Sequence, residues 1–160
     1  MENKEFKKLF DEMTEKYGFE SAFSGWFKES DECIVVLDLQ KSSFSNSFYL
    51  NIKVYVHGLF GKIYHKSKDL VKKEIGNVFT RTPNEYNNIL DLENEMESIL
   101  RVGKMELLFK EFIVPFADKM LTRVGVKELA QTDEDFLLPA VKKDLDRLML
   151  SMKLKNLGDV

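Results

Sequence analysis

The first apolar residues of the chain are spaced as they would be on one face of a helix. They recur every three or four positions between residues 6 and 17, and Gly18 then follows as a common helix stop. These apolar residues are Phe6, Leu9, Phe10, Met13 and Tyr17. The pattern predicts an amphipathic N-terminal helix that packs its apolar face against another element.

Segment 48–57 alternates between two kinds of position. Every second residue is apolar, and the residues between them are polar or carry a polar group on a ring. The apolar set is Phe48, Leu50, Ile52, Val54 and Val56, and the other set is Tyr49, Asn51, Lys53, Tyr55 and His57. Such alternation predicts a strand with one buried face and one partly wet face, which is typical of antiparallel sheets.

Three more segments have the character of strands. Segment 19–27 carries four aromatic residues, and the turn-forming residues "SDE" separate it from the apolar run "CIVVLDLQ". These two segments predict a hairpin. The stretch "NVFTRTP" predicts a further short strand that Pro83 stops, because proline cannot donate to a sheet ladder.

The second half of the sequence returns to helical spacing. We expect a long amphipathic helix from Leu92, a new segment or a kink at Pro115, and a last helix from about Pro139. The order of elements predicts an α+β fold, in which an antiparallel sheet of about four to five strands packs the N-terminal helix and the C-terminal helices on one face. Without a linker, residues 1–160 form a single domain.

The composition agrees with a domain that holds its own core. The chain has 160 residues, of which 44% are hydrophobic, and Cys33 is its single cysteine. One cysteine excludes an internal disulfide and favours a reducing cytoplasm, with Cys33 itself a buried strand residue. No apolar run approaches the ~20 residues of a membrane span, and the N-terminus lacks the apolar core of a signal peptide. We therefore expect a cytoplasmic protein without membrane association.

The net charge of −3 hides two segregated blocks. Residues 41–81 contain eight Lys or Arg against two acidic residues, whereas residues 82–100 contain five acidic residues and no base. The two blocks either compensate each other in the fold or leave an exposed basic patch for an acidic partner. The balance lacks the strong excess of positive charge found in dedicated nucleic-acid domains, so nucleic-acid binding, through the basic stretch "GKIYHKSKDLVKK", is only a third hypothesis.

Several chemistries lack the residues that they require. His57 and His65 are the only histidines, which leaves a metal site or a Ser-His-Asp site without enough partners. The stretch "GLFGK" at 58–62 has two residues between its glycines, whereas a phosphate-binding loop has four. We expect no metal and no cofactor.

The stretch "LDLQKSSFSNSFYLNIKV" is either a plain hairpin or a site. Serines and Asn46 suit a loop of about six residues between Gln40 and Ser47, whereas Asp38 and Gln40 would share a strand face with polar residues of the next strand. The candidate binding surface consists of Gln40, Lys41, Ser42, Ser43, Tyr49, Asn51, Tyr55 and His57.

The same region resembles a known family. The motifs "WFKE" at 26–29, "LDLQKSSF" at 37–44 and "FYLNIKVY" at 48–55, followed by "FTRTP", resemble the bacterial domain-of-unknown-function family 4304 (DUF4304). The resemblance covers about residues 4–125 and leaves a C-terminal helical extension of about 126–155. It implies a stand-alone cytoplasmic domain and transfers no catalytic residue.

From these observations we expect a non-catalytic binding domain that acts through a protein partner. Neutralisation of a toxin, as by an immunity protein, is one version, because a small acidic domain suits the capture of a basic protein. An enzyme or small-ligand binder that uses the same polar face, with His57 as acid or base, is the alternative. We expect a monomer, or a dimer formed through the C-terminal helices.

Overall fold

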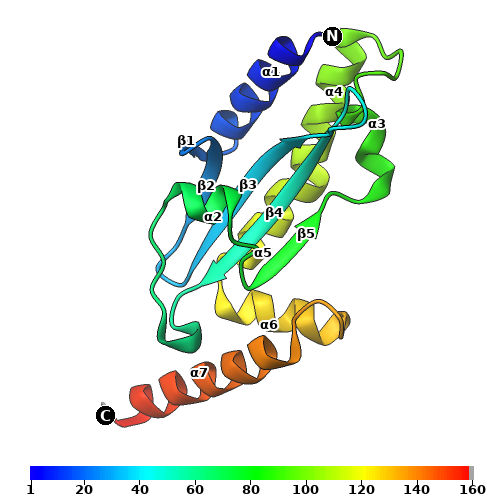
Figure 1. The fold of residues 1–160 in the computed structure, drawn as a ribbon. Helices are drawn as coiled ribbons and strands as arrows, with labels where there is room; N and C mark the ends of the chain where they lie inside the picture. Colours follow the sequence, from blue (N-terminus) through cyan, green and yellow to red (C-terminus); the bar gives the residue numbers. More distant parts are fainter. Residues whose placement is uncertain (159–160) are drawn as a thin grey trace.

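Five antiparallel strands form one sheet, in the order in which they occur in the chain (Figure 1). The structure is a computed structural model that describes residues 1–158. The strands are β1 (Glu20–Ala22), β2 (Gly25–Glu29), β3 (Cys33–Lys41), β4 (Phe48–Val56) and β5 (Val78–Arg81). The antiparallel sheet, its hairpins and the short last strand are confirmed as predicted.

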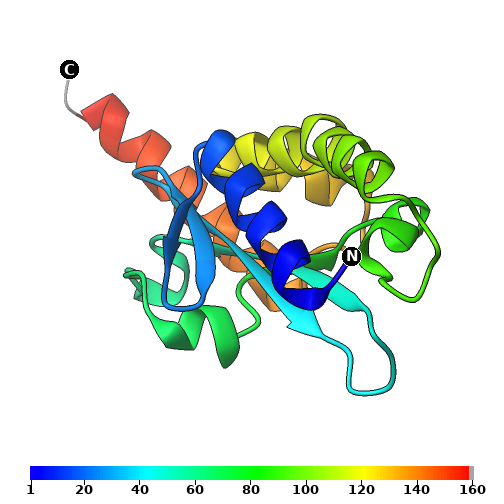
Figure 2. The same cartoon turned by 90° about the horizontal axis from the view of Figure 1, so that it is seen from above.

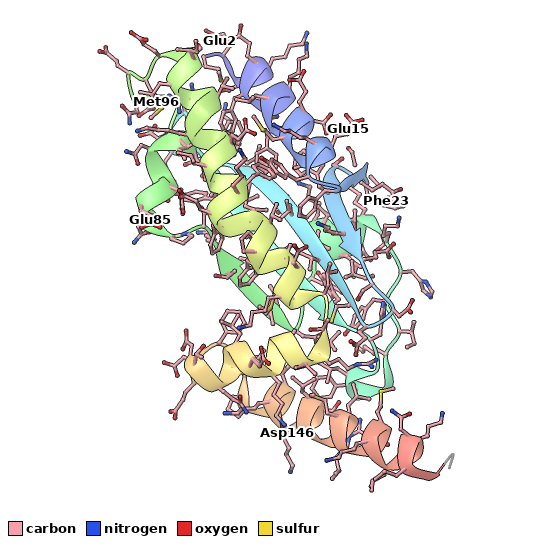
Figure 3. The ribbon with its side chains drawn as sticks, turned by 180° about the vertical axis from the view of Figure 1, so that it is seen from behind. Glu2, Glu15, Phe23, Glu85, Met96 and Asp146 are labelled. Atoms are coloured by element: carbon pink, nitrogen blue, oxygen red, sulfur yellow. The ribbon has the colours of Figure 1, made fainter. Side chains whose placement is uncertain are left out.

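The inner face of the sheet carries the main core. It packs against α1 (Asn3–Lys16), α4 (Ser98–Leu108) and α5 (Val114–Met120), which Figure 3 shows in front of the strands. The apolar positions of α1 and β4 meet here, and the rings of Phe6 and Phe48 stack with centroids 5.1 Å apart. Phe10 lies between Trp26 and Phe109, with ring centroids at 4.8 and 5.5 Å. The apolar residues of the helical pattern in α1 and of the alternating pattern in β4 therefore share one core.

The outer face is covered only in part. The short helix α2 (Lys68–Lys72) lies on this face, on the side of the strands away from α1 and α4 (Figure 2). A second, smaller core forms beneath it from Phe27, Ile34, Val36, Tyr55, Leu70 and Val71. Burial on both faces explains why β3 begins with a continuous apolar run and becomes polar only from Asp38 onwards.

The C-terminal helices lie at the end of the sheet where β3 begins and β4 ends (Figure 1). They are α6 (Arg123–Thr132) and α7 (Pro139–Gly158). The Asp144 carboxylate of α7 accepts the backbone N–H of Phe60 at 2.7 Å, which ties the helix to the turn at Leu59–Gly61. The far half of α7 extends away from the sheet. Among the helices of residues 1–158, none is long and apolar enough to cross a membrane.

The first long helix after the sheet begins later than predicted. We expected it from Leu92, but α4 begins at Ser98, and the acidic residues before it lie in a loop that follows the short helix α3 (Asn87–Leu90) and the turn Asn84–Tyr86. Further along, the π-helical turn Phe109–Ile113 leads into α5, whose first turn contains Pro115. The backbone angles at Phe109, Ile113 and Val114 are all helical, so the helix continues through the π-helical turn, and Pro115 falls in the first turn of α5.

The buried side chain of Arg101 accounts for the late start of α4. Only 1% of this residue is exposed, and its guanidinium donates to two backbone carbonyls of α3 and two of the loop that follows it. The acceptors lie 2.6–3.1 Å away and belong to Asn88, Ile89, Asp91 and Asn94. The loop carbonyls of Asp91 and Asn94 bond to Arg101 instead of to helical N–H groups, so this segment keeps a non-helical path before α4.

Replacement of Arg101 by Met should destabilise the fold strongly. Met fills similar space but leaves four carbonyls without their donor, so we expect a loss of about 3 kcal/mol in the free energy of unfolding, measured by urea denaturation. The matched control is Arg147→Met, because Arg147 lies on the surface of α7 in an ion pair with Asp144. That variant should change stability by about 0.5 kcal/mol or less. Equal losses in both variants would contradict the role of Arg101.

Candidate functional site

A connected set of polar side chains occupies the outer face beyond α2. The strand register places Asp38 opposite Asn51, and Asn51 opposite Arg81 of β5. The Asn51 amide nitrogen donates to Gln40 Oε1 at 2.9 Å and to Asp38 Oδ2 at 3.2 Å, and its Oδ1 accepts from Arg81 Nε at 2.9 Å. We call Asp38, Gln40, Tyr49, Asn51 and Arg81 the outer polar cluster.

The cluster holds its arginine in one orientation. The Arg81 guanidinium carbon lies 4.5 Å from the centroid of the Tyr49 ring, directly over its face. Arg81 is thus held by a hydrogen bond on one side and a cation–π contact on the other. A planar guanidinium that is fixed in this way keeps further N–H groups available for a carboxylate or carbonyl.

Charge beneath the cluster is largely satisfied within the protein. The buried carboxylate of Asp38 forms an ion pair with Lys72 Nζ at 2.7 Å. Lys53 is also buried, and its ammonium donates to the carbonyl of Val71. Burial lowers the pKa of Lys53, and the nearby Asp38 charge opposes that shift. These contacts join α2 to the sheet and leave Arg81 and Gln40 as the accessible polar groups of the cluster. Lys41 is exposed too, but strand alternation places it on the inner side of β3, opposite Phe48.

Exposed aromatic rings flank the accessible part of the cluster. Tyr49 is 41% exposed, and Phe79 on the neighbouring strand is 42% exposed. At the tip of the hairpin, Phe44 is 97% exposed. A small hollow of about 140 Å³ adjoins the cluster and is lined in part by Tyr49, Arg81 and Asn87. The surface therefore combines one fixed cation with rings that are not covered by the rest of the chain.

Ser42 and Ser43 belong to the hairpin loop rather than to the cluster. The loop spans residues 42–47, and its length agrees with the prediction. Ser42 is buried, its N–H donates to Ser47 O at 2.9 Å, and its hydroxyl accepts the N–H of Phe44 at 3.2 Å. These contacts are those of a turn, so the structure assigns both serines a local structural setting.

Tyr55 does not belong to the accessible surface. It is 1% exposed, and its hydroxyl donates to Leu70 O at 2.6 Å beneath α2. Burial raises the pKa of this hydroxyl. The sequence pattern assigned Tyr55 to the wet face correctly, but it did not show that α2 covers this part of that face.

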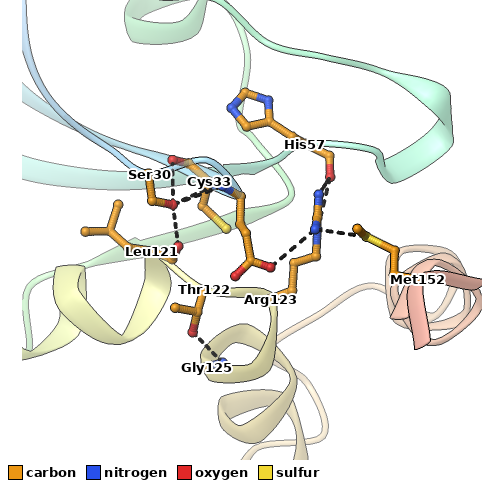
Figure 4. Close-up of polar contacts among 9 residues, drawn as sticks. Ser30, Cys33, His57, Leu121, Thr122, Arg123, Gly125 and Met152 are labelled. Atoms are coloured by element: carbon orange, nitrogen blue, oxygen red, sulfur yellow. Dashed lines mark hydrogen bonds and ion pairs between the residues drawn. The ribbon is translucent and has the colours of Figure 1, made fainter. Parts of the chain in front are cut away.

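His57 is also separate from the cluster, because it follows the opposite end of β4. Its Nδ1 accepts the N–H of Tyr64 at 3.1 Å, and its carbonyl accepts two hydrogen bonds from Arg123, at 2.7 and 3.3 Å (Figure 4). Arg123 also pairs with Glu32 at 3.2 Å. This part of the structure joins α6 to the sheet, and the predicted grouping of His57 with Gln40 and Asn51 does not occur.

Cys33 lies beside this junction and is fully buried, as predicted (Figure 4). Burial, reinforced by the charge of Glu32, raises the pKa of its thiol to about 12. Its sulfur therefore lacks the thiolate character of a reactive cysteine. In residues 1–158, no group of three or more His, Cys, Asp or Glu side chains is arranged to hold a metal ion.

The two charge blocks of the sequence do not neutralise each other by direct ion pairs. Among the described residues, the paired bases of 41–81 contact acids outside residues 82–100: Lys66 with Glu20 and Glu29, Lys72 with Asp38, and Lys73 with Asp69. In the acidic block, Glu93 accepts the N–H of Asn46 and so supports the hairpin loop. In this part of the chain, Arg81 of the outer polar cluster and Lys41 at the edge of β3 therefore remain exposed without a carboxylate partner.

Sequence reasoning missed Arg81 and Lys72. Arg81 occurs in the short strand "VFTR", and its position on the outer face follows once β5 is paired with β4 in the observed register. Lys72 reaches Asp38 from α2, which is separated from it by 34 residues in the chain. Because both contacts join residues that are distant in the chain, no local pattern of residue spacing predicts them.

The sheet, the helices over its inner face and the polar cluster on its outer face define a small α+β domain. The chain belongs to the family described as a domain of unknown function (DUF4304), which matches residues 10–119. The outer polar cluster lies wholly inside the matched region, whereas α6 and α7 lie outside it. No curated protein and no solved structure matches the chain.

The setting of His57 predicts a pH effect on stability. Burial lowers the pKa of this histidine, and the positive charge of Arg123 lowers it further. The unfolded chain therefore binds a proton more readily than the folded chain, so stability should fall as pH decreases below about 6.5.

This effect can be measured by urea denaturation at about pH 7.5 and 5.5. A His57→Gln variant should lose less stability between the two pH values than the wild type does. His65→Gln carries the same change at an exposed loop position and should behave as the wild type. An unchanged loss in His57→Gln would show that the histidine does not contribute to this dependence.

Proposed function

We propose that this protein is a non-catalytic binding domain that acts through a protein partner, with the outer polar cluster as its contact surface. The observation that carries the proposal is the orientation of Arg81, which is fixed by Asn51 and by the ring of Tyr49. The exposed ring of Tyr49 belongs to the cluster, and exposed Phe79 lies two residues before Arg81 on β5. Arginine and aromatic residues are the types most enriched among the residues that dominate binding energy in protein interfaces.

Preorganisation supports the same proposal. A flexible arginine loses rotamer freedom when it binds, and this cost reduces affinity. In the free protein, Arg81 already makes its hydrogen bond to Asn51, and Asn51 is in turn fixed by Gln40 and Asp38. A partner carboxylate that meets Arg81 would therefore order few additional groups.

The local charge favours a partner whose contact surface is acidic. The net charge of −3 led us to expect capture of a basic protein, but Arg81 is exposed at the cluster, and Asp38 is buried in its pair with Lys72. Neutralisation of a toxin remains one version of the proposal, with an acidic patch on the toxin. We place this interaction in the cytoplasm, because the single cysteine is suited to a reducing compartment.

Self-association through the C-terminal helices stays a prediction. The outward half of α7 carries exposed leucines at a spacing of three and four residues, which are Leu150, Leu154 and Leu157. Such spacing places them on one stripe of the helix. The mass of the native protein in solution distinguishes a monomer from a dimer.

The contact surface can be tested with Arg81→Ala. The tagged protein is used to capture its partner from the lysate of its source organism at about 150 mM salt, and affinity is then measured with the purified partner. We expect Arg81→Ala to reduce affinity about tenfold or more, because it removes the fixed cation at the centre of the surface. Tyr49→Ala should also weaken binding, whereas Tyr49→Phe, which keeps the ring, should not.

The matched control is Arg147→Ala, which removes an exposed arginine from α7 at the other end of the molecule. Thermal unfolding of each variant shows whether the fold is retained. If folded Arg81→Ala and Tyr49→Ala bind the partner as the wild type does, the cluster is not the contact surface.

A further inference from the structure

The half of β3 that leads to the hairpin has a free edge. β2 pairs with β3 only from Trp26, opposite Leu37, to Glu29, opposite Ile34. Continuation of this register would place Ser24 opposite Leu39. Instead, Phe23 and Ser24 adopt positive φ angles of 53° and 63° in the turn to β1, and the chain leads away from β3.

The backbone groups of Leu39 and Lys41 point toward this free edge. Ser42 N–H bonds across to Ser47 on the β4 side, and Cys33 C=O accepts Ser30 N–H on the β2 side. Strand residues alternate between the two sides, so even positions of β3 bond to β4 and odd positions face β2. Leu39 and Lys41 therefore present two N–H and two C=O groups beyond the point where β2 ends.

A groove of about 510 Å³ lies beside this edge. Its lining comes from α1, the β1–β2 hairpin, β3 and α2, and includes Lys7, Ser24, Trp26, Leu39 and Lys72. The groove is thus bounded by a helix on each face of the sheet. An extended segment that paired with β3 would lie in it, with alternate side chains directed toward α1 and toward α2.

Positive charge borders the groove. Lys7, Lys8 and Lys72 line it, and the exposed Lys41 lies on the free edge itself. The one carboxylate in the lining, Asp11, accepts the Trp26 indole N–H at 2.7 Å. These lysines of the lining also have contacts within the protein. Lys72 pairs with Asp38, Lys7 lies 5.9 Å from the Phe48 ring, and Lys8 approaches Glu12 at 3.9 Å in an exposed pair of small energetic weight.

We propose that the free edge of β3 accepts an extended, acidic segment of a partner protein by β-strand addition. Main-chain hydrogen bonds to Leu39 and Lys41 supply the pairing, and alternate Asp or Glu side chains meet the lysines of α1 and the edge lysine. The inference concerns a strand edge and a groove, not the outer polar cluster, and it holds whether or not that cluster binds a partner.

A second copy of the chain fits the same edge poorly. Antiparallel pairing of two β3 edges about a two-fold axis would bring Lys41 of each copy, and the lysines around each groove, close together. Like charges directly opposite each other across strands are destabilising. The lysine at the edge thus disfavours pairing with a second copy, as edge lysines do in natural sheets. The same positive charge favours an acidic strand.

The test uses a synthetic peptide of about eight residues that alternates Glu and Val, with both ends blocked, added to ¹⁵N-labelled protein. We expect the amide signals of Leu39 and Lys41 to shift progressively with peptide concentration at about 50 mM salt. A peptide with Lys in place of each Glu should leave them unchanged. Absence of shifts at Leu39 and Lys41 with the acidic peptide at about 1 mM would overturn the proposal.

Two pairs of variants separate strand pairing from charge. Lys41→Pro removes the edge N–H without removing a bond to β4 and should abolish binding, whereas Lys41→Ala should retain it apart from a few-fold loss. Lys7→Glu with Lys8→Glu should weaken binding at least tenfold. The same change of charge at Lys153 and Lys155, which are exposed on α7, should have little effect.

The remaining outcomes are also decisive. If Lys41→Pro does not fold, the two lysine pairs still test the groove. Concentration-dependent dimerisation that depends on Lys41 would assign the edge to a second copy and overturn the acidic partner. Arg81→Ala should bind the peptide as the wild type does, so failure of the cluster proposal and failure of this one give different results.

Discussion

The pairing of β3 with β4 is the constraint on which the rest of the structure depends. Nine residue pairs, from Cys33 with Val56 to Lys41 with Phe48, fix the register of the two longest strands. Because side chains alternate across a sheet, a shift of one residue would exchange the inner and outer faces. The observed register sends Leu37 and Leu50 into the main core and brings Asp38, Gln40 and Asn51 together on the other side. The core and the candidate site are thus two results of one pairing.

The outer face is divided by the length of α2. This helix has five residues and covers the half of the face that carries Ile34, Val36 and Tyr55. Where it ends, the strands change to polar residues that satisfy one another, as Asn51 does with Gln40, Asp38 and Arg81. A polar side chain that is exposed to water or fully hydrogen-bonded carries little free-energy cost. An exposed apolar patch at the same place would have to be buried by another element. The uncovered region is therefore stable without a further element of the chain.

Much of the fold follows from local pattern, and the remainder depends on contacts between distant residues. Alternation in segment 48–57 gave both faces of β4, and the spacing of Phe6, Phe10 and Met13 gave α1. The start of α4 was wrong by six residues because Arg101 bonds to the carbonyls before it, and a buried arginine has no signature in sequence spacing. Tyr55 was assigned to the correct face, but its burial depends on α2. The proximity of Gln40 and Asn51 was predicted, whereas Arg81 required the register of β5.

The two surfaces that we propose lie in the same half of the sheet for one reason. β2 and α2 are both short, so the hairpin half of β3 and β4 lacks a neighbour at its edge and a cover on its outer face. At the opposite end, α6 and α7 join the strands through Arg123 and Asp144. Such an uncovered half is a hazard for aggregation if it is apolar. Here Lys41 lies at the edge, and Arg81 and Gln40 make the face polar. We propose that the charge that disfavours self-association also favours an acidic partner. The same residues can thus protect the free protein and define what it binds.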